Sequence, residues 1–214
     1  MRIRFDEQLK QLNKEMINMG TMIEESIGDA VKALMKQDVE LAQKVMAGDE
    51  EIDRTERKIE DLCLRLLLQQ QPVARDLRNI SAALKMVTDM ERIGDHATDI
   101  SELAIVLSEK TYVKKLNYIE EMARETMVML IQSLEAYVEK DLDKAQKVIA
   151  HDDVIDDLFE EVKQELIELI RNHADEGEQA VDLLMVTKYF ERIGDHATNI
   201  AEWVIFSITG QIAG

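Results

Sequence analysis

Few residues in this sequence would interrupt a helix. Among its 214 residues there are one proline, Pro72, and eight glycines, the two residue types that most destabilise a helix interior. Aromatic residues make up only 4% of the chain, whereas apolar residues make up 46%, so aliphatic side chains and methionine must fill the core. The scarcity of helix breakers predicts long helices and an all-α fold.

Other scarcities exclude whole classes of protein. A single cysteine, Cys63, cannot form an internal disulfide, and its leucine-rich surroundings predict a small core residue. No segment approaches the ~20 consecutive apolar residues of a membrane span, and the start of the chain lacks the apolar run of a signal peptide. With 26 basic and 44 acidic residues the net charge is −18, which argues against binding to nucleic acid or anionic lipid. We therefore expect a cytoplasmic protein with no nucleic-acid partner and no direct membrane insertion.

An eight-residue segment occurs twice in the chain without a change. Residues 91–98 and residues 191–198 both read Glu-Arg-Ile-Gly-Asp-His-Ala-Thr. Upstream, residues 42–45 match residues 145–148 as Ala-Gln-Lys-Val, so the separation between copies is 103 residues there and 100 at the longer segment. A repeat of this length fits a duplicated domain rather than a solenoid unit.

Each copy carries three helix-like apolar segments joined by short links. Pro72 ends the second of them, because proline cannot continue the helical hydrogen-bond ladder. The predicted helices span residues 5–36, 38–70, 74–108, 116–140, 142–172 and 179–208. Three long helices with short connections form an antiparallel bundle. We therefore predict two tandem three-helix bundles, residues 1–110 and 111–214, without strands.

The repeated segment places its acids on one face of a helix. At 100° per residue, Glu91, Asp95 and Asp99 fall within about 80° of one another, whereas Ile93 and Ala97 lie on the opposite side. The apolar side must face the core, so the acids are predicted on the bundle surface. A ferritin-like di-iron site differs, because it projects its carboxylates and a Glu-x-x-His motif inward.

A second pair of acids precedes each repeated segment. In an antiparallel pair of helices that turns at Pro72, residues equally far from the turn lie side by side. Asp53 and Glu91 are such a pair, and so are Asp49 and Asp95. The second copy repeats this arrangement about its predicted turn at residues 173–177, with Asp152, Asp156, Glu191 and Asp195.

Four carboxylates at one place repel one another unless a cation lies between them. Oxygen ligands suit hard cations such as ferric iron, Mn, Mg or Ca. The sequence therefore favours a surface metal site in each copy, although an acidic face that is merely solvated remains the alternative interpretation. His96 and His196 fall outside the acidic stripe and are expected to hydrogen-bond to a neighbour rather than to ligate.

These motifs resemble the PhoU family of phosphate-specific transport system accessory proteins. The resemblance rests on Glu-Arg-Ile-Gly-Asp-His at residues 91–96 and 191–196, and on Asp-x-x-x-Asp at residues 49–53 and 152–156. It covers essentially the whole chain. It implies a cytoplasmic, homodimeric, all-α regulator that has no catalytic activity of its own.

The resemblance also implies partners and a metal. The partners would be the sensor histidine kinase and the ATPase subunit of the phosphate ABC transporter, both under negative regulation. Iron is the expected metal, with Mn, Mg, Ca or Zn as alternatives. The implied metal ligands are Asp49, Asp53, Glu91, Asp95, Asp152, Asp156, Glu191 and Asp195, with Asp99 and its counterpart Asn199 as additional candidates.

A carboxylate-bridged metalloenzyme or a metal-storage protein is the competing function. The sequence lacks a Glu-x-x-His motif, a glycine-rich phosphate loop, and a Ser or Cys nucleophile next to a base. A surface cluster also lacks the water-excluding cavity that metal catalysis usually needs. Regulation by binding is therefore the favoured function.

Overall fold

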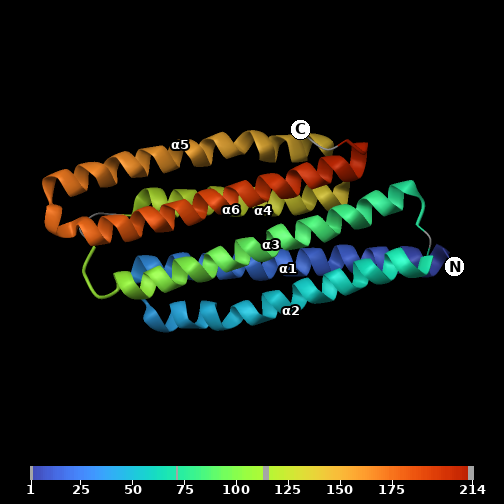
Figure 1. The fold of residues 1–214 in the computed structure, drawn as a ribbon, viewed down its shortest axis with the longest axis horizontal. Coiled ribbons are helices and arrows are strands. Elements are labelled where there is room, and N and C mark those ends of the chain that lie inside the picture. The colour runs from blue at the N-terminus through green and yellow to red at the C-terminus, as the bar shows by residue number, and fades with distance from the viewer. Residues whose placement is uncertain (1, 71, 113–115, 212–214) are drawn as a thin grey trace.

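The computed structural model describes residues 2–70, 72–112 and 116–211, and within them the chain is helical without strands (Figure 1). The all-α prediction is confirmed. The elements are α1 (Arg2–Lys36), α2 (Val39–Gln70), α3 (Ala74–Leu107), α4 (Asn117–Glu139), α5 (Leu142–Asn172), the 3₁₀ turn η1 (Ala174–Glu176) and α6 (Gly177–Thr209).

Local sequence signals account for the helix ends. Asp38 caps α2, because its Oδ1 accepts the backbone N–H of Leu41 at 3.0 Å. Asp141, its counterpart in the second copy, caps α5 by accepting the N–H of Lys144 at 2.9 Å. Pro72 lies between the end of α2 and the start of α3, as predicted.

The boundaries differ from prediction by a few residues. The turn predicted at residues 173–177 is shorter, because η1 leads directly into α6 at Gly177. Helix α4 ends at Glu139, and Lys140 adopts a left-handed conformation with φ 58°. The predicted link at residues 111–115 lies partly outside the described residues.

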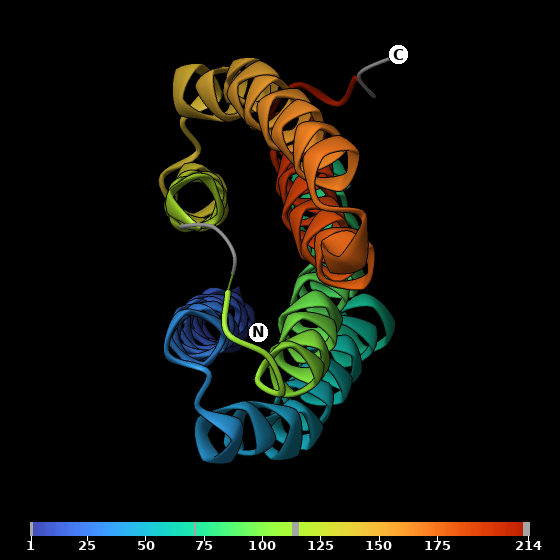
Figure 2. The same ribbon diagram turned by 90° about the vertical axis from the view of Figure 1, so that its left-hand side faces the viewer.

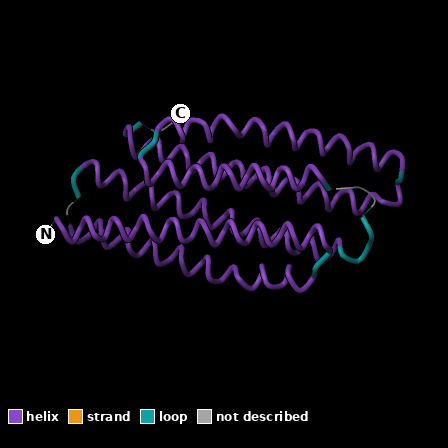
Figure 3. Tube along the Cα trace, turned by 180° about the vertical axis from the view of Figure 1, so that it is seen from behind, coloured by secondary structure: helices purple, strands orange, loops and turns teal. Residues whose placement is uncertain are grey.

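The six helices form two antiparallel three-helix bundles that lie side by side. Helices α1, α2 and α3 pack together, as do α4, α5 and α6. The bundles meet where α3 packs against α6 and α1 packs against α4, so α2 and α5 are outermost (Figure 2). The connections gather at the two ends of the molecule (Figure 3). Helices α3 and α6, which carry the repeated segment, therefore lie at the interface between the bundles.

Aliphatic side chains and methionines fill the interior, as the composition predicts. Met16, Met86 and Cys63 are fully buried. Gly20 on α1 allows close packing against α4, because a Cβ at this position would collide with the side chain of Leu134. No described helix has the length and apolar character needed to cross a membrane.

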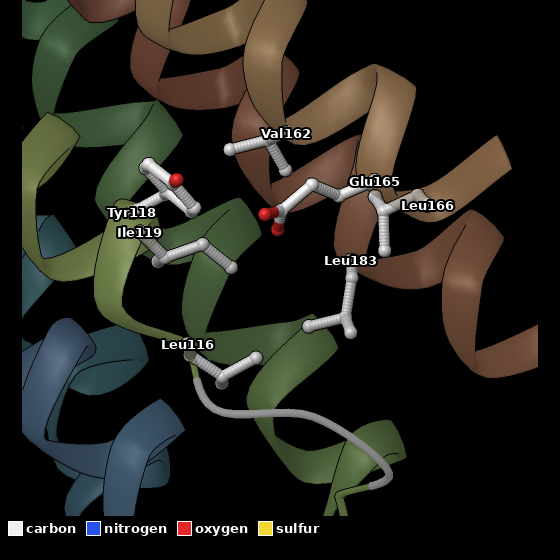
Figure 4. A pocket seen from close by; sticks show the side chains of 7 residues that line it. All are labelled: Leu116, Tyr118, Ile119, Val162, Glu165, Leu166 and Leu183. Atoms are coloured by element: carbon white, nitrogen blue, oxygen red, sulfur yellow. The ribbon is translucent and has the colours of Figure 1, made fainter. Parts of the chain in front are cut away.

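A small apolar cavity lies in the second bundle (Figure 4). Its volume is about 20 Å³, roughly the space of one water molecule. Its lining residues are Leu116, Tyr118, Ile119, Val162, Glu165, Leu166 and Leu183. It is too small to hold a substrate or cofactor.

Candidate metal centre

The acids of the first copy lie on two neighbouring helices and outside the core. Asp49 and Asp53 belong to α2, and Glu91 and Asp95 belong to α3, which packs against α2. All four are half-buried. We call these four residues the first acidic cluster.

The carboxylates of the first acidic cluster repel one another. Burial raises the pKa of Asp49, and the charges of Asp95 and Asp53 raise it further. Burial also raises the pKa of Glu91, followed by the charges of Asp95, Asp53 and Asp49. The hydroxyl of Thr98 lowers the pKa of Asp49, although it stays outside hydrogen-bond geometry. The two helices therefore bring the four acids within electrostatic reach of one another.

The second copy repeats this arrangement on α5 and α6. We call Asp152, Asp156, Glu191 and Asp195 the second acidic cluster. Burial raises the pKa of Asp152 to about 6, and the charges of Asp195, Asp156 and Glu191 contribute. Asp156 and Asp195 also have raised pKa values, again from burial first and then from Glu191. Both of these residues are exposed, so this cluster is open to solvent.

Basic side chains partly neutralise both clusters. Arg92 Nη1 lies 3.0 Å from Asp95 Oδ2, and Arg57 Nη2 lies 3.0 Å from Asp53 Oδ2. In the second cluster, Lys188 Nζ lies 2.5 Å from the Glu191 carboxylate. Across residues 2–70, 72–112 and 116–211, no three His, Cys, Asp or Glu side chains are positioned to hold a metal ion together. The ion pairs thus occupy carboxylate oxygens of Asp53, Asp95 and Glu191.

A glycine of each repeated segment lies directly beneath its cluster. A Cβ at Gly94 would lie 3.2 Å from Ile52 Cγ2 and 3.9 Å from Asp49 Oδ1. A Cβ at Gly194 would lie 3.2 Å from Asp152 Oδ1. The absent side chains therefore allow the outer helix, with its acid, to lie close to the inner helix.

The structure adds a carboxylate that the sequence reasoning missed. Burial raises the pKa of Glu56 on α2 to about 7, with further contributions from Glu91, Glu60 and Asp53. Glu56 follows Asp53 by three residues, which places both on one helix face, so the spacing could have indicated it. Its counterpart in the second copy, at a separation of 103 residues, is Phe159, so the two clusters differ in charge.

The histidines of the repeated segments face the interface between the bundles. Their ring centroids lie 5.7 Å apart. His96 Nδ1 lies 3.0 Å from Asp99 Oδ2 on its own helix, whereas His196 Nδ1 lies 2.8 Å from Asp89 Oδ1 on the other bundle. Each histidine hydrogen-bonds to a neighbouring acid, as expected from the sequence.

These contacts also account for the two additional candidates. Asp99 is held by His96 and is the weakest of the charges that raise the pKa of Asp49. Asn199 donates through Nδ2 to Asp89 Oδ1 at 3.1 Å. Both residues therefore contribute to the interface between the bundles, next to rather than within the clusters.

Comparison with known proteins places both halves in one family. Residues 16–104 and 119–204 each match the PhoU domain. A phosphate-specific transport system accessory protein PhoU homolog from Clostridium acetobutylicum is 40% identical over 208 residues, which cover 97% of this chain and 95% of that protein. PhoU homolog 1 from Thermotoga maritima is 32% identical over 210 residues, which cover 98% of this chain and 90% of that protein.

Solved structures agree with this relationship. The crystal structure of PhoU from Pseudomonas aeruginosa matches with a TM-score of 0.92 at 33% identity, covering 97% of this chain and all of that one. The phosphate transport system regulatory protein PhoU from Streptococcus pneumoniae matches with a TM-score of 0.91 at 26% identity, covering 98% of this chain and 99% of that one. The repeated segment, the duplicated bundle and these matches lead to one conclusion: the chain belongs to the PhoU family.

Proposed function

We propose that this protein is a cytoplasmic regulator of phosphate uptake and of phosphate-starvation signalling that acts by binding other proteins. The observation that carries the proposal is the match, along nearly the whole chain, to proteins named as accessory or regulatory components of phosphate transport. The protein would act as a homodimer and a negative regulator. Its partners would be the sensor histidine kinase and the ATPase subunit of the phosphate ABC transporter.

The charge of the molecule supports a role in binding. A net charge of −18 attracts basic surfaces and raises the rate of association more than the affinity. The competing function, a metalloenzyme or metal-storage protein, is less well supported. The exposure of Asp156 and Asp195 leaves the second cluster without the dry cavity that metal catalysis usually needs.

We further propose that each acidic cluster binds metal, with iron as the expected ion and Mn, Mg, Ca or Zn as alternatives. The ligands would be the four acids of each cluster, which offer the oxygen-only donor set that hard cations prefer. The raised pKa values of Asp49, Glu91 and Asp152 support this assignment, because a cation would relieve the same repulsion. When bound, the metal supplies positive charge that links α2 to α3 and α5 to α6.

Deletion of the gene tests the regulatory role. We expect phosphate-starvation genes to be expressed in phosphate-rich medium after deletion, and repression to return with the wild-type gene. Affinity purification of the tagged protein should recover the sensor kinase and the transporter ATPase. Normal repression in the deletion strain, with no paralogue to compensate, would contradict the proposal.

Elemental analysis of protein purified without added metal tests the clusters. We expect bound metal in the wild type, and about half as much when the second cluster is neutralised by Asp152→Asn and Asp195→Asn, because the first cluster stays intact. Chelation should lower the melting temperature but leave the helical circular dichroism signal, since each bundle has its own apolar core. Loss of the helical signal in chelator would mean that the metal is required for folding.

A further inference from the structure

A cavity of about 350 Å³ is lined by residues near the starts of α1 and α3 and near the ends of α4 and α6. These helix ends lie together at one end of the molecule (Figure 1). Its lining residues are Leu9, Val73, Arg75, Asp76, Arg78, Asn79, Lys140, Ser207 and Ile208. We call it the basic pocket, because three of these side chains are cationic and one is anionic. Its charge is 3 − 1 = +2, in a protein whose net charge is −18.

The cations of the basic pocket come from both bundles. Arg75 and Arg78 belong to the first turns of α3, whereas Lys140 caps the end of α4. Lys140 Nζ donates to Asn79 Oδ1 and lies 4.0 Å above the ring of Tyr137. A ligand in this pocket would therefore contact both halves of the protein.

Among the described residues, no acidic side chain forms an ion pair with these cations. Neither arginine forms an ion pair with a described residue, and Nε of Arg78 is buried without a hydrogen-bond partner there. The Arg78 side chain lies against Gly210, where a Cβ would come within 3.3 Å of Cδ and 3.5 Å of Nε. Burial lowers the pKa of Lys140 to about 8, and the charge of Arg75 lowers it further. The pocket thus retains unneutralised positive charge.

The first turn of α3 adds to this charge. Its cap residue, Val73, has no side-chain oxygen to accept the first N–H groups of the helix. Free N–H groups at a helix N-terminus carry partial positive charge and bind anions. Both Val73 and Arg75 line the pocket.

The corresponding helix ends in the other half of the duplication form without these cations. The counterpart of this pocket lies at the opposite end of the molecule and has a volume of about 80 Å³. We call it the acidic pocket, because its charged residues are Lys110, Glu109, Glu178 and Asp182, which give 1 − 3 = −2. At separations of 100 and 103 residues, Arg78 corresponds to Glu178 and Lys140 corresponds to Gln37.

Gln37 occupies the same left-handed conformation as Lys140, with φ 55° against 58°. Its Nε2 donates to the carbonyl oxygens of Leu107 and Lys110 at 2.8 and 2.6 Å. Hydrogen bonds from a neutral side chain therefore satisfy these two carbonyl groups at and just after the end of α3. Compensation of helix dipoles therefore does not account for the lysine and the two arginines at the basic pocket.

We propose that the basic pocket binds a phosphoryl oxyanion, either free orthophosphate or the phosphate group of a nucleotide-sized ligand. A doubly charged anion balances the pocket charge of +2, and the arginine fork suits phosphate oxygens. The volume lies at the lower end of the range for small-molecule sites, and it admits more than a single phosphate ion. This inference does not depend on the proposed regulatory role.

Isothermal titration of the full-length, chelator-treated protein at pH 7 tests the proposal. Chelation removes metal ions that would themselves attract phosphate. The probes are orthophosphate, AMP, and adenosine as a ligand without phosphate. We expect orthophosphate, AMP or both to bind, and adenosine not to bind. Tighter binding of AMP than of orthophosphate would identify a nucleotide-like ligand, and equal or weaker binding would identify free phosphate.

Three variants locate the binding. Lys140→Gln copies the residue of the other half, and Arg78→Gln removes the guanidinium beside Gly210. Each should weaken binding about tenfold or more, because each removes one charge-assisted hydrogen bond to the ligand. Arg75→Gln, at an exposed position, provides the same test should Arg78→Gln fail to fold. The matched control, Lys110→Gln at the acidic pocket, should leave binding unchanged.

Two results would overturn the proposal. One is the absence of measurable binding of both orthophosphate and AMP at millimolar concentration. The other is binding that persists with unchanged affinity in folded Lys140→Gln and in a folded arginine variant. In the second case the anion binds elsewhere on the protein.

Discussion

Nδ1 of His196 on α6 lies 2.8 Å from Oδ1 of Asp89 on α3, so an acid of the first bundle holds a histidine of the second. This contact is not repeated in the reverse direction, because Tyr189 occupies the position of the second copy that corresponds to Asp89. His96 stacks on Tyr189 at 5.5 Å between ring centroids and takes its carboxylate from Asp99 instead. Each histidine therefore contacts one carboxylate, but only one of these two contacts joins residues of different bundles.

The first prediction concerns the pair Asp89 and His196. Asp89→Ala and His196→Ala should each lower the free energy of unfolding. Both side chains are largely buried, and each substitution removes the hydrogen-bond partner of the side chain that remains. A double-mutant cycle in urea should give a coupling of about 1 kcal/mol, typical of a hydrogen bond to a charged or partly buried group. A coupling near zero would show that this contact does not stabilise the association of the bundles.

The second prediction concerns pH. Burial lowers the pKa of His96 more than hydrogen bonding to Asp99 raises it, and the charges of His196 and Arg192 lower it further. The folded protein therefore binds this proton less readily than the unfolded chain, so stability decreases as the pH falls below the ordinary histidine value of about 6.5. His96→Gln should remove this part of the pH dependence.

Denaturation of the wild type and of His96→Gln between about pH 5 and pH 8 measures the difference, over a range that includes the ordinary histidine pKa. The wild type should lose more stability on acidification than the variant. Both proteins must be free of metal, since protons and metal ions compete for the nearby carboxylates. Parallel curves would show that His96 titrates without a shift.

The third prediction concerns Asp152. Its pKa is raised from 3.8 to about 6, chiefly by burial and then by Asp195. Its ionised form therefore costs stability at pH 7, and this cost decreases as the pH falls from the folded value towards the ordinary one. In metal-free protein, Asp152→Asn should raise stability at pH 7 by on the order of 1 kcal/mol, after allowance for solvent screening. The same variant should bind less metal.

The control for this prediction is Asp61→Asn, which removes an exposed acid of α2 outside both clusters. It should change neither stability nor metal content measurably. A destabilising effect of Asp152→Asn in the metal-free protein would mean that Asp152 is stabilised by contacts other than the repelling acids.

The fourth prediction compares two glycines within helices. Gly48→Ala should stabilise the protein by up to ~1 kcal/mol, the usual helix preference for alanine, because no atom outside its own helix lies within 4 Å of the added methyl group. Gly194→Ala places its methyl group 3.2 Å from Asp152 Oδ1. It should gain less stability and should reduce metal binding in the second cluster, by displacing this carboxylate. Thermal unfolding with elemental analysis separates the two effects.

Much of the fold could be predicted because few residues interrupt its periodicity. Pro72 and Asp38 mark helix boundaries by local chemistry alone, and the acids fall opposite Ile93 and Ala97 on any helix. The turn before α6 was harder to predict, because Gly177 continues into the helix rather than ending the turn. Such a choice depends on neighbouring helices rather than on the local sequence.

The candidate site was predictable only in part. Equal distances from Pro72 correctly placed Asp49, Asp53, Glu91 and Asp95 on adjacent helices. Their partners Arg57 and Arg92 depend on side-chain rotamers, which the sequence does not specify.

The interface between the bundles and the basic pocket lay beyond sequence reasoning. Contacts such as Asp89 with His196 join residues 107 positions apart, and the pocket combines four helix ends. Neither follows from the periodicity of one helix.

The two halves of this molecule are no longer interchangeable. Residue 96 meets residue 189, and residue 196 meets residue 89, which is the reciprocity of a symmetric dimer. A chain made of two first halves would offer each histidine two acids, Asp89 and Asp99. A chain made of two second halves would offer none, because Tyr189 and Asn199 take those places. Joining two copies in one polypeptide thus allowed the second half to lose both acids, because the first half supplies one to each histidine.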